Sequence, residues 1–176
     1  MIRRILCPTE LTAASQDSLA YAFRLAKENG AQLIVFHATK LPTLSQYPCD
    51  MDDYFQWQQF LSKFRVDHLL EDAKLRVTHF VRARFEAASV GIDWKTKVAL
   101  GDAAEEIVRA ALQEEADLVV MHRCKKGVLA QFFGRSVSEA VGRSAPCPVL
   151  SIDAPRGGRS SGTWRLPVLR ELLQNS

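Results

Sequence analysis

Apolar residues occur along the chain in two alternating patterns. Short apolar runs predict five strands, at residues 3–7, 31–38, 92–100, 117–122 and 149–152. The runs 31–38 and 117–122 are apolar almost throughout, which is typical of strands buried on both faces of a parallel sheet. The run 92–100 alternates apolar and polar residues, which predicts a strand with one covered face.

Between these runs, apolar residues recur at helical spacing. They predict helices from Thr12 to about Glu28, from Asp53 to about Ala88 with a bend left open, from Asp102, and from Ser136 to about Arg143. Thr12 is the expected cap of the first helix. Asp102 with Glu105, and Ser136 with Glu139, have the spacing of capping boxes. Asn29-Gly30 and Gly91 end the first two helices, and residues 41–52 are expected to form a loop.

Strands that alternate with helices predict an α/β fold, in which an open parallel sheet carries helices on both faces. In such sheets ligands bind beyond the carboxyl ends of the strands, where the strand order reverses. Three segments end there: Pro8-Thr9-Glu10, His37-Ala38 and the loop that begins at Met121.

Composition narrows the class of protein. The chain has 176 residues, 47% hydrophobic and 24% charged, which suits one globular domain with a tail. A formal net charge of +3 is too small to indicate a nucleic-acid partner. No apolar stretch approaches the ~20 residues of a membrane span, and the apolar run before Pro8 is too short for a signal peptide.

Cysteine and histidine spacing gives no indication of a metal site. The four cysteines include no C-x-x-C pair, and the four histidines are scattered along the chain. Free thiols suit a reducing compartment, so we expect a cytoplasmic protein without a metal.

The composition changes after Asp153. Residues 154–176 begin as a Gly/Ser/Arg linker and end in "LPVLRELLQN", whose leucines have the spacing of a short amphipathic helix. Two interpretations stay open: a partly disordered tail, or a segment that docks on its own domain or on a partner chain.

Four segments, in order, resemble the universal stress protein family over about residues 1–153. They are "RRILCPTELTAASQDSLAYAFRLAKENGAQLIVFHA", "GDAAEEIVRAA", "ADLVVMHR" and "GRSVSEAVGRSAPCPVLSI". The resemblance implies a five-stranded sheet of order 3-2-1-4-5, of the Rossmann-like kind found in adenine nucleotide alpha hydrolases. It also implies a homodimer formed through the last strand, at Val149, Leu150, Ser151 and Ile152. An exposed apolar edge strand needs pairing or cover in any case, and the tail is the alternative cover.

Family members that bind ATP carry G-x-x-G, nine residues, and then G-S or G-T. On this chain the first two glycine positions are assigned to Met121 and Cys124 and the third to Gly134, with Arg135 as an insertion before Ser136. The resemblance further implies cofactor-binding roles for a set of residues at the strand ends and the helix start: Pro8, Thr9, Glu10, Ala38, Gly134, Ser136 and Val137.

This loop has features for and against nucleotide binding. Side chains at Met121 and Cys124 take up room that backbone N–H groups need in order to approach a phosphate. Gly134 to Ser136 leads into a helix start, where free N–H groups attract anions. The cations Arg123, Lys125, Lys126 and Arg135 add positive charge, or form an ordinary solvated basic face.

The motifs of common enzyme classes do not occur: the sequence has no G-x-S-x-G, no G-x-x-x-x-G-K-[ST] and no G-x-G-x-x-G after the first strand. Glu10 and His122 could both face the crevice as a general acid and base, but His122 is better explained as the end of a strand. We therefore expect a non-catalytic stress-response or regulatory homodimer with a degenerate nucleotide loop. Two alternatives are an ATP-binding switch that uses Gly134–Ser136 and basic side chains, and an interaction module that binds an acidic partner.

Overall fold

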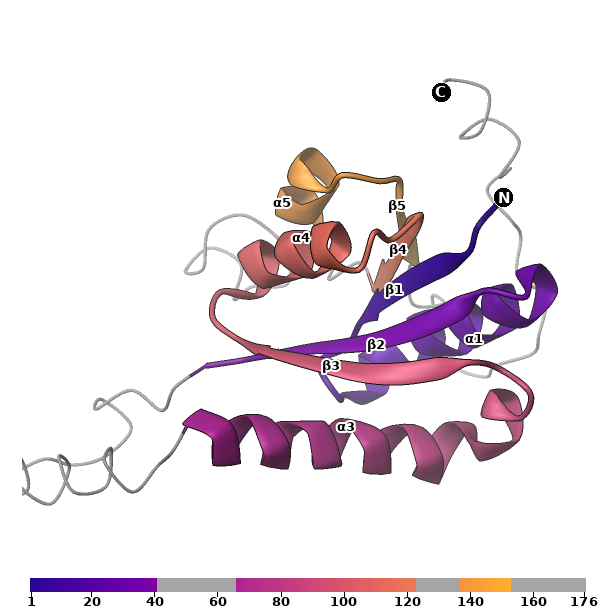
Figure 1. The fold of residues 1–176 in the computed structure, drawn as a ribbon, viewed down its shortest axis with the longest axis horizontal. Helices are drawn as coiled ribbons and strands as arrows, with labels where there is room; N and C mark the ends of the chain where they lie inside the picture. Colours follow the sequence, from indigo (N-terminus) through magenta and orange to yellow (C-terminus); the bar gives the residue numbers. More distant parts are fainter. Residues whose placement is uncertain (41–65, 123–136, 153–176) are drawn as a thin grey trace, which may run out of the picture.

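The computed structural model describes residues 1–40, 66–122 and 137–152. Strands and helices alternate along the chain (Figure 1). In order, they are β1 (Arg4–Pro8), the 3-10 turn η1 (Ala13–Ser15), α1 (Gln16–Asn29), β2 (Gln32–Thr39), α3 (Val66–Ser89), β3 (Trp94–Leu100), α4 (Ala103–Gln113), β4 (Leu118–His122), α5 (Val137–Ser144) and β5 (Val149–Ile152).

The strands form one parallel sheet in the order β3-β2-β1-β4-β5. This confirms the predicted α/β fold and the predicted order 3-2-1-4-5. The order reverses beside β1, which pairs with β2 on one side and with β4 on the other. The carboxyl ends of β1 and β4 therefore form the switch point at which sheets of this kind hold ligands.

Helices cover both faces of the sheet, with α1 and α3 on one face and α4 and α5 on the other (Figure 1). Each central strand sends alternate side chains to the two layers, because successive Cβ atoms of a strand point to opposite faces. In β1, Ile5 and Cys7 pack with the α1 and α3 layer, whereas Leu6 packs with the α4 and α5 layer. The continuous apolar runs in the sequence follow from this burial on both faces.

The edge strand β3 is covered less completely. Trp94 and Val98 are half-buried against the α1 and α3 layer, and Ala99 packs against the other layer. Lys95 and Lys97 instead reach Glu114 at the end of α4, with Nζ to carboxylate oxygen distances of 2.7 and 2.6 Å. The predicted half-covered strand is confirmed.

Local signals located most helix ends. The carboxylate of Asp102 accepts hydrogen bonds from the backbone N–H groups of Ala104 and Glu105, at 2.9 and 3.4 Å, as the predicted cap requires. Gly30 ends α1 in the left-handed conformation, with a φ of 61°. The predicted second capping box includes Ser136, which lies outside the described residues, as do the loop 41–52 and the tail.

The prediction for Thr12 was wrong in its detail. The Thr12 side chain makes no capping hydrogen bond, and its carbonyl oxygen instead accepts from the N–H of Ser15 at 3.2 Å. The chain therefore makes one 3-10 turn before α1 begins at Gln16. The predicted long helix is described from Val66 onward and carries the bend at Phe85, where φ is −126° and ψ is 19°.

Candidate functional site

The loop after β1 forms one wall of the switch point, and Thr9 holds it in place. The backbone N–H of Thr9 donates to the carbonyl oxygen of Phe36 in β2 at 2.8 Å. Its hydroxyl shares a 2.9 Å hydrogen bond with the Ser15 hydroxyl and accepts from the N–H of Leu11 at 3.1 Å. Thr9 is 5% exposed, so these bonds satisfy polar groups that are shielded from water.

The same loop is tied to the end of β2. The Nδ1 atom of His37 lies 2.8 Å from the carbonyl oxygen of Thr9. A carbonyl oxygen only accepts hydrogen bonds, so Nδ1 carries the proton in this contact. In the neutral ring, Nε2 is then the nitrogen that can accept a hydrogen bond. The ends of β1 and β2 are thus joined both through the backbone and through a histidine side chain.

The structure separates the predicted binding residues into different environments. Pro8 is the last residue of β1 and is half-buried, whereas Glu10 is exposed. Ala38 lies in β2 beside Ala99 of β3 and packs against the α4 and α5 layer. Val137 is the first residue of α5 and is 37% exposed. The other predicted loop residues lie outside the described part of the chain: Cys124, Gly134 and Ser136.

Met121 belongs to the hydrophobic core. Its side chain is 5% exposed and packs in the layer that includes Ile107 and Val141. In the described residues it therefore fills space between the sheet and the helices α4 and α5. The assignment of a family glycine to Met121, and the idea that its side chain obstructs a nucleotide, stay predictions.

His122 follows Met121 and ends β4 at the switch point. It alternates with Met121 and so shares the strand face of Leu118 and Val120, which pack with α1. Its Nδ1 atom is buried and has no hydrogen-bond partner among residues 1–40, 66–122 and 137–152. A buried polar atom that truly lacks a partner costs roughly 1–3 kcal/mol, which makes this end of β4 a candidate position for a polar contact outside the described residues.

The polar network under the β1 loop was missed in the sequence. The Ser18 hydroxyl donates to the carbonyl oxygen of Ser15 at 3.0 Å, and both serines are buried. Burial raises the pKa of the nearby Cys7 thiol to about 12, and Ser18 opposes this with a smaller lowering effect. The sequence could have indicated this network only through the spacing of Ser15 and Ser18, which are three residues apart at a helix start. Their burial, however, depends on the packing of α1 on β1.

The described residues contain neither a metal-binding group of side chains nor a membrane-spanning helix. Within residues 1–40, 66–122 and 137–152, no group of three or more His, Cys, Asp or Glu side chains could hold a metal ion. Within the same residues, no helix has the length and apolar content needed to cross a membrane.

The fold and its switch point define a doubly wound α/β protein. The chain belongs to the universal stress protein family, whose family model matches residues 1–152. A universal stress protein of Thermus aquaticus is 30% identical over 155 residues, which cover 86% of this chain and 99% of that protein.

Solved structures show the same fold. The structure of the hypothetical protein MJ0577 has a TM-score of 0.64 and 22% identity, covering 89% of this chain and 99% of that one. A universal stress protein solved in complex with cAMP has a TM-score of 0.55 and 18% identity, covering 86% of this chain and 97% of its own.

Proposed function

We propose that this protein is a non-catalytic stress-response regulator that acts as a homodimer, and that its nucleotide site is weakened. The observation that carries the proposal is the end of β4, where Met121 and His122 carry full side chains. Met121 fills the core, and the imidazole of His122 has a ring nitrogen withdrawn from solvent. Backbone N–H groups can cradle a phosphate only where side chains leave room for its approach.

The decisive experiment is calorimetric titration with Mg-ATP. We expect no binding heat from the native protein and measurable binding from His122→Gly, which opens the strand end without removing a core side chain. Met121→Gly is a poorer variant, because it would leave a cavity beside Ile107 and Val141. His68→Gly is the control, since His68 is an exposed histidine on α3 and lies away from the switch point.

Tight binding of Mg-ATP by the native protein would contradict the weakened site. Phosphate release measured with the same samples tests the non-catalytic part separately. We expect release at the buffer rate from the native protein, and release that depends on Glu10 or His122 would identify an enzyme.

One observation favours the second candidate, an ATP-binding switch. The wall of the switch point formed by Pro8, Thr9 and Glu10 is held by hydrogen bonds to β2 and to Ser15, and small Ala38 stands near the end of β2. A universal stress protein of the same fold was solved in complex with cAMP, and this candidate extends nucleotide binding to the present chain. This candidate predicts a rise in the melting temperature on addition of Mg-ATP. The third candidate, a module for an acidic partner, depends on loop cations outside the described residues.

The homodimer is proposed through β5. Within the described residues, this strand pairs with β4 alone, and the backbone along its other side is an edge that a second copy can cover. We also place the protein in the cytoplasm, because Cys7 and Cys147 are free thiols.

A further inference from the structure

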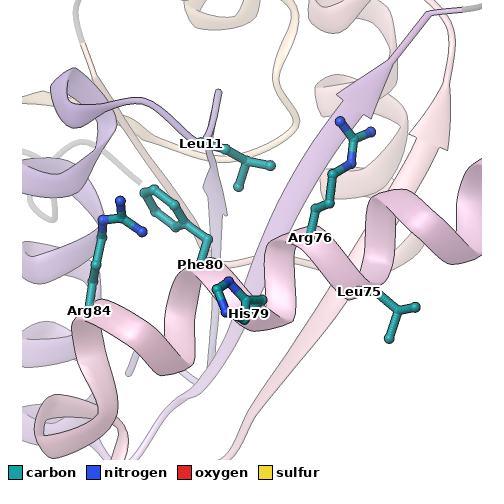
Figure 2. Close-up of a pocket in the computed structure, with 6 residues that line it drawn as sticks. All are labelled: Leu11, Leu75, Arg76, His79, Phe80 and Arg84. Carbon is teal, nitrogen blue, oxygen red and sulfur yellow. The ribbon is translucent and has the colours of Figure 1, made fainter.

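A groove lies between α3 and the loop after β1, on the α1 and α3 side of the sheet (Figure 2). It has a volume of about 380 Å³ and is a shallow groove that is broadly open at the surface. Six residues line it: Leu11, Leu75, Arg76, His79, Phe80 and Arg84. Neither the family assignment nor the proposed function uses these residues.

The lining has one kind of charge. Two arginines and a histidine stand among two leucines and a phenylalanine, and none of the six carries a carboxylate. The leucine Leu75 is 69% exposed on α3, which is a large apolar exposure for one helical residue. A ligand that complements this lining has an anionic group and an apolar body.

The guanidinium of Arg84 is held in an orientation that suits an anionic ligand. Its guanidinium carbon lies 4.6 Å from the centre of the Phe80 ring. Stacking on the ring restrains the side chain and occupies one flat face of the guanidinium, while its N–H edge stays available. Binding of a carboxylate or phosphate therefore costs less side-chain entropy here than at a freely rotating arginine.

Among the described residues, the ion pair of Arg76 is a weak one. Its Nε atom lies 3.1 Å from the Asp72 carboxylate one turn earlier, and the two side chains are 53% and 66% exposed. Ion pairs of this exposure and spacing contribute roughly 0.3–0.5 kcal/mol. Arg76 can therefore exchange Asp72 for the anionic group of a ligand at little cost.

Leu11 forms the wall of the groove opposite α3, and its backbone is strained. Its φ is 59°, a left-handed conformation that non-glycine residues seldom adopt. The hydrogen bond from its N–H to the Thr9 hydroxyl, 3.1 Å long, holds it there. Strained residues of this kind gather at ligand sites, where the surrounding structure fixes them for a purpose other than stability.

We propose that this groove binds a small organic anion with an aromatic or branched apolar body. Its carboxylate or phosphate meets the guanidinium of Arg84, while Arg76 adds positive charge at the other end of the groove (Figure 2). Its apolar body packs against Leu11 and the small exposed part of Phe80. The groove volume lies in the range of roughly 300–1,000 Å³ that small-molecule sites occupy. A stable protein–protein interface buries an area much larger than six residues can provide.

The test uses 2-naphthoate as the probe and 2-naphthalenemethanol as its uncharged counterpart, titrated into the full-length protein and followed by NMR. We expect naphthoate to shift the amide signals of α3 and Leu11, and the alcohol to bind at least tenfold more weakly. Arg84→Gln should weaken naphthoate about tenfold, as loss of one charge-assisted hydrogen bond does. Arg82→Gln is the matched control, because Arg82 is an exposed arginine on the same helix that does not line the groove.

A gain-of-binding variant separates recognition from general damage. Asp72→Asn removes the carboxylate that competes for Arg76, so we expect naphthoate to bind about twofold to threefold more tightly. Added salt should weaken binding to the native protein, since the attraction is electrostatic at an exposed site.

Three results would overturn the proposal. Equal losses in Arg84→Gln and Arg82→Gln would mean that naphthoate responds only to overall charge. Equal affinities for naphthoate and its alcohol would leave the arginines without a role. Binding of an acidic amphipathic peptide at these residues, with no binding of naphthoate, would make the groove a protein-docking surface.

Discussion

The side chain of Glu106 packs against the α-carbon of Gly101. A Cβ atom on Gly101 would lie 2.7 Å from Oε1 of Glu106 and 2.9 Å from its Cγ. Glu106 is buried, and its Oε1 is held at 2.6 Å by Nη1 of Arg109, so it has little freedom to withdraw. The close approach positions the turn from β3 into α4.

We therefore predict that Gly101→Ala lowers the free energy of unfolding by about 1–3 kcal/mol, the usual cost of overpacking. The φ of +155° at Gly101 adds strain for any side chain. Gly142→Ala is the control: it lies within α5, no described atom lies within 4 Å of its added Cβ, and it should stabilise by about 0.5–1 kcal/mol. Urea unfolding of both variants measures the contrast, and equal effects would rule out the Gly101–Glu106 contact as the cause.

Neighbouring residues at the end of β4 should respond in opposite ways. Met121→Ala should lower the free energy of unfolding by about 2–4 kcal/mol, because it leaves a cavity in the α4 and α5 layer. His122→Ala should be neutral or stabilise by up to about 1 kcal/mol, since it removes a buried nitrogen that has no partner in the part of the chain that the structure describes. Denaturant titration compares them. A larger loss from His122→Ala would show that the histidine has a structural role.

Glu114 should make stability depend on pH in the acid range. Hydrogen bonds from Lys95 and then Lys97 hold the pKa of the Glu114 carboxyl below its ordinary value. Its stabilising contribution is thus present above the unfolded-state pKa and is lost as pH falls through the lower folded-state pKa. The N–H groups of Arg3 and Arg4 lower the pKa of Asp117, which acts in the same direction.

Glu114→Gln should therefore destabilise the protein by roughly 0.5–1 kcal/mol at neutral pH, allowing for solvent screening of the partly exposed lysines. The difference from the native protein should shrink as pH falls below about 4. Chemical unfolding across the pH range measures it, with Glu86→Gln, at an exposed position on α3, as the control. A difference that is independent of pH would mean that Glu114 acts through packing.

A charge on the edge strand should disrupt the proposed dimer. Ser151 is half-buried in β5, so Ser151→Lys places an ammonium group within an interface formed by this strand. We expect light scattering after size exclusion to show a dimer for the native protein and a monomer for the variant. Val90→Lys is the control, because Val90 is 69% exposed and lies after α3. A dimer that survives Ser151→Lys would place the interface elsewhere.

Hydrophobic periodicity was sufficient for most of the fold. The run 31–38 predicted a strand buried on both faces, and β2 is buried that way because α1 and α4 pack on opposite sides of it. The cap at Asp102 was also predictable, since a capping carboxylate acts on N–H groups two and three residues away. The error at Thr12 arose because a 3-10 turn and an α-helix have similar sequence signals over three residues.

The sequence by itself determined the strands, the helices and their alternation, because these depend on contacts between residues close together in the chain. Only the tertiary structure decided which side chains meet. It placed the proton of His37 against the carbonyl of Thr9, turned Met121 into the core, and brought Leu11 opposite Arg84 across a groove. These relationships join residues tens of positions apart, and packing of the helices on the sheet, which no local pattern encodes, sets the distances between them.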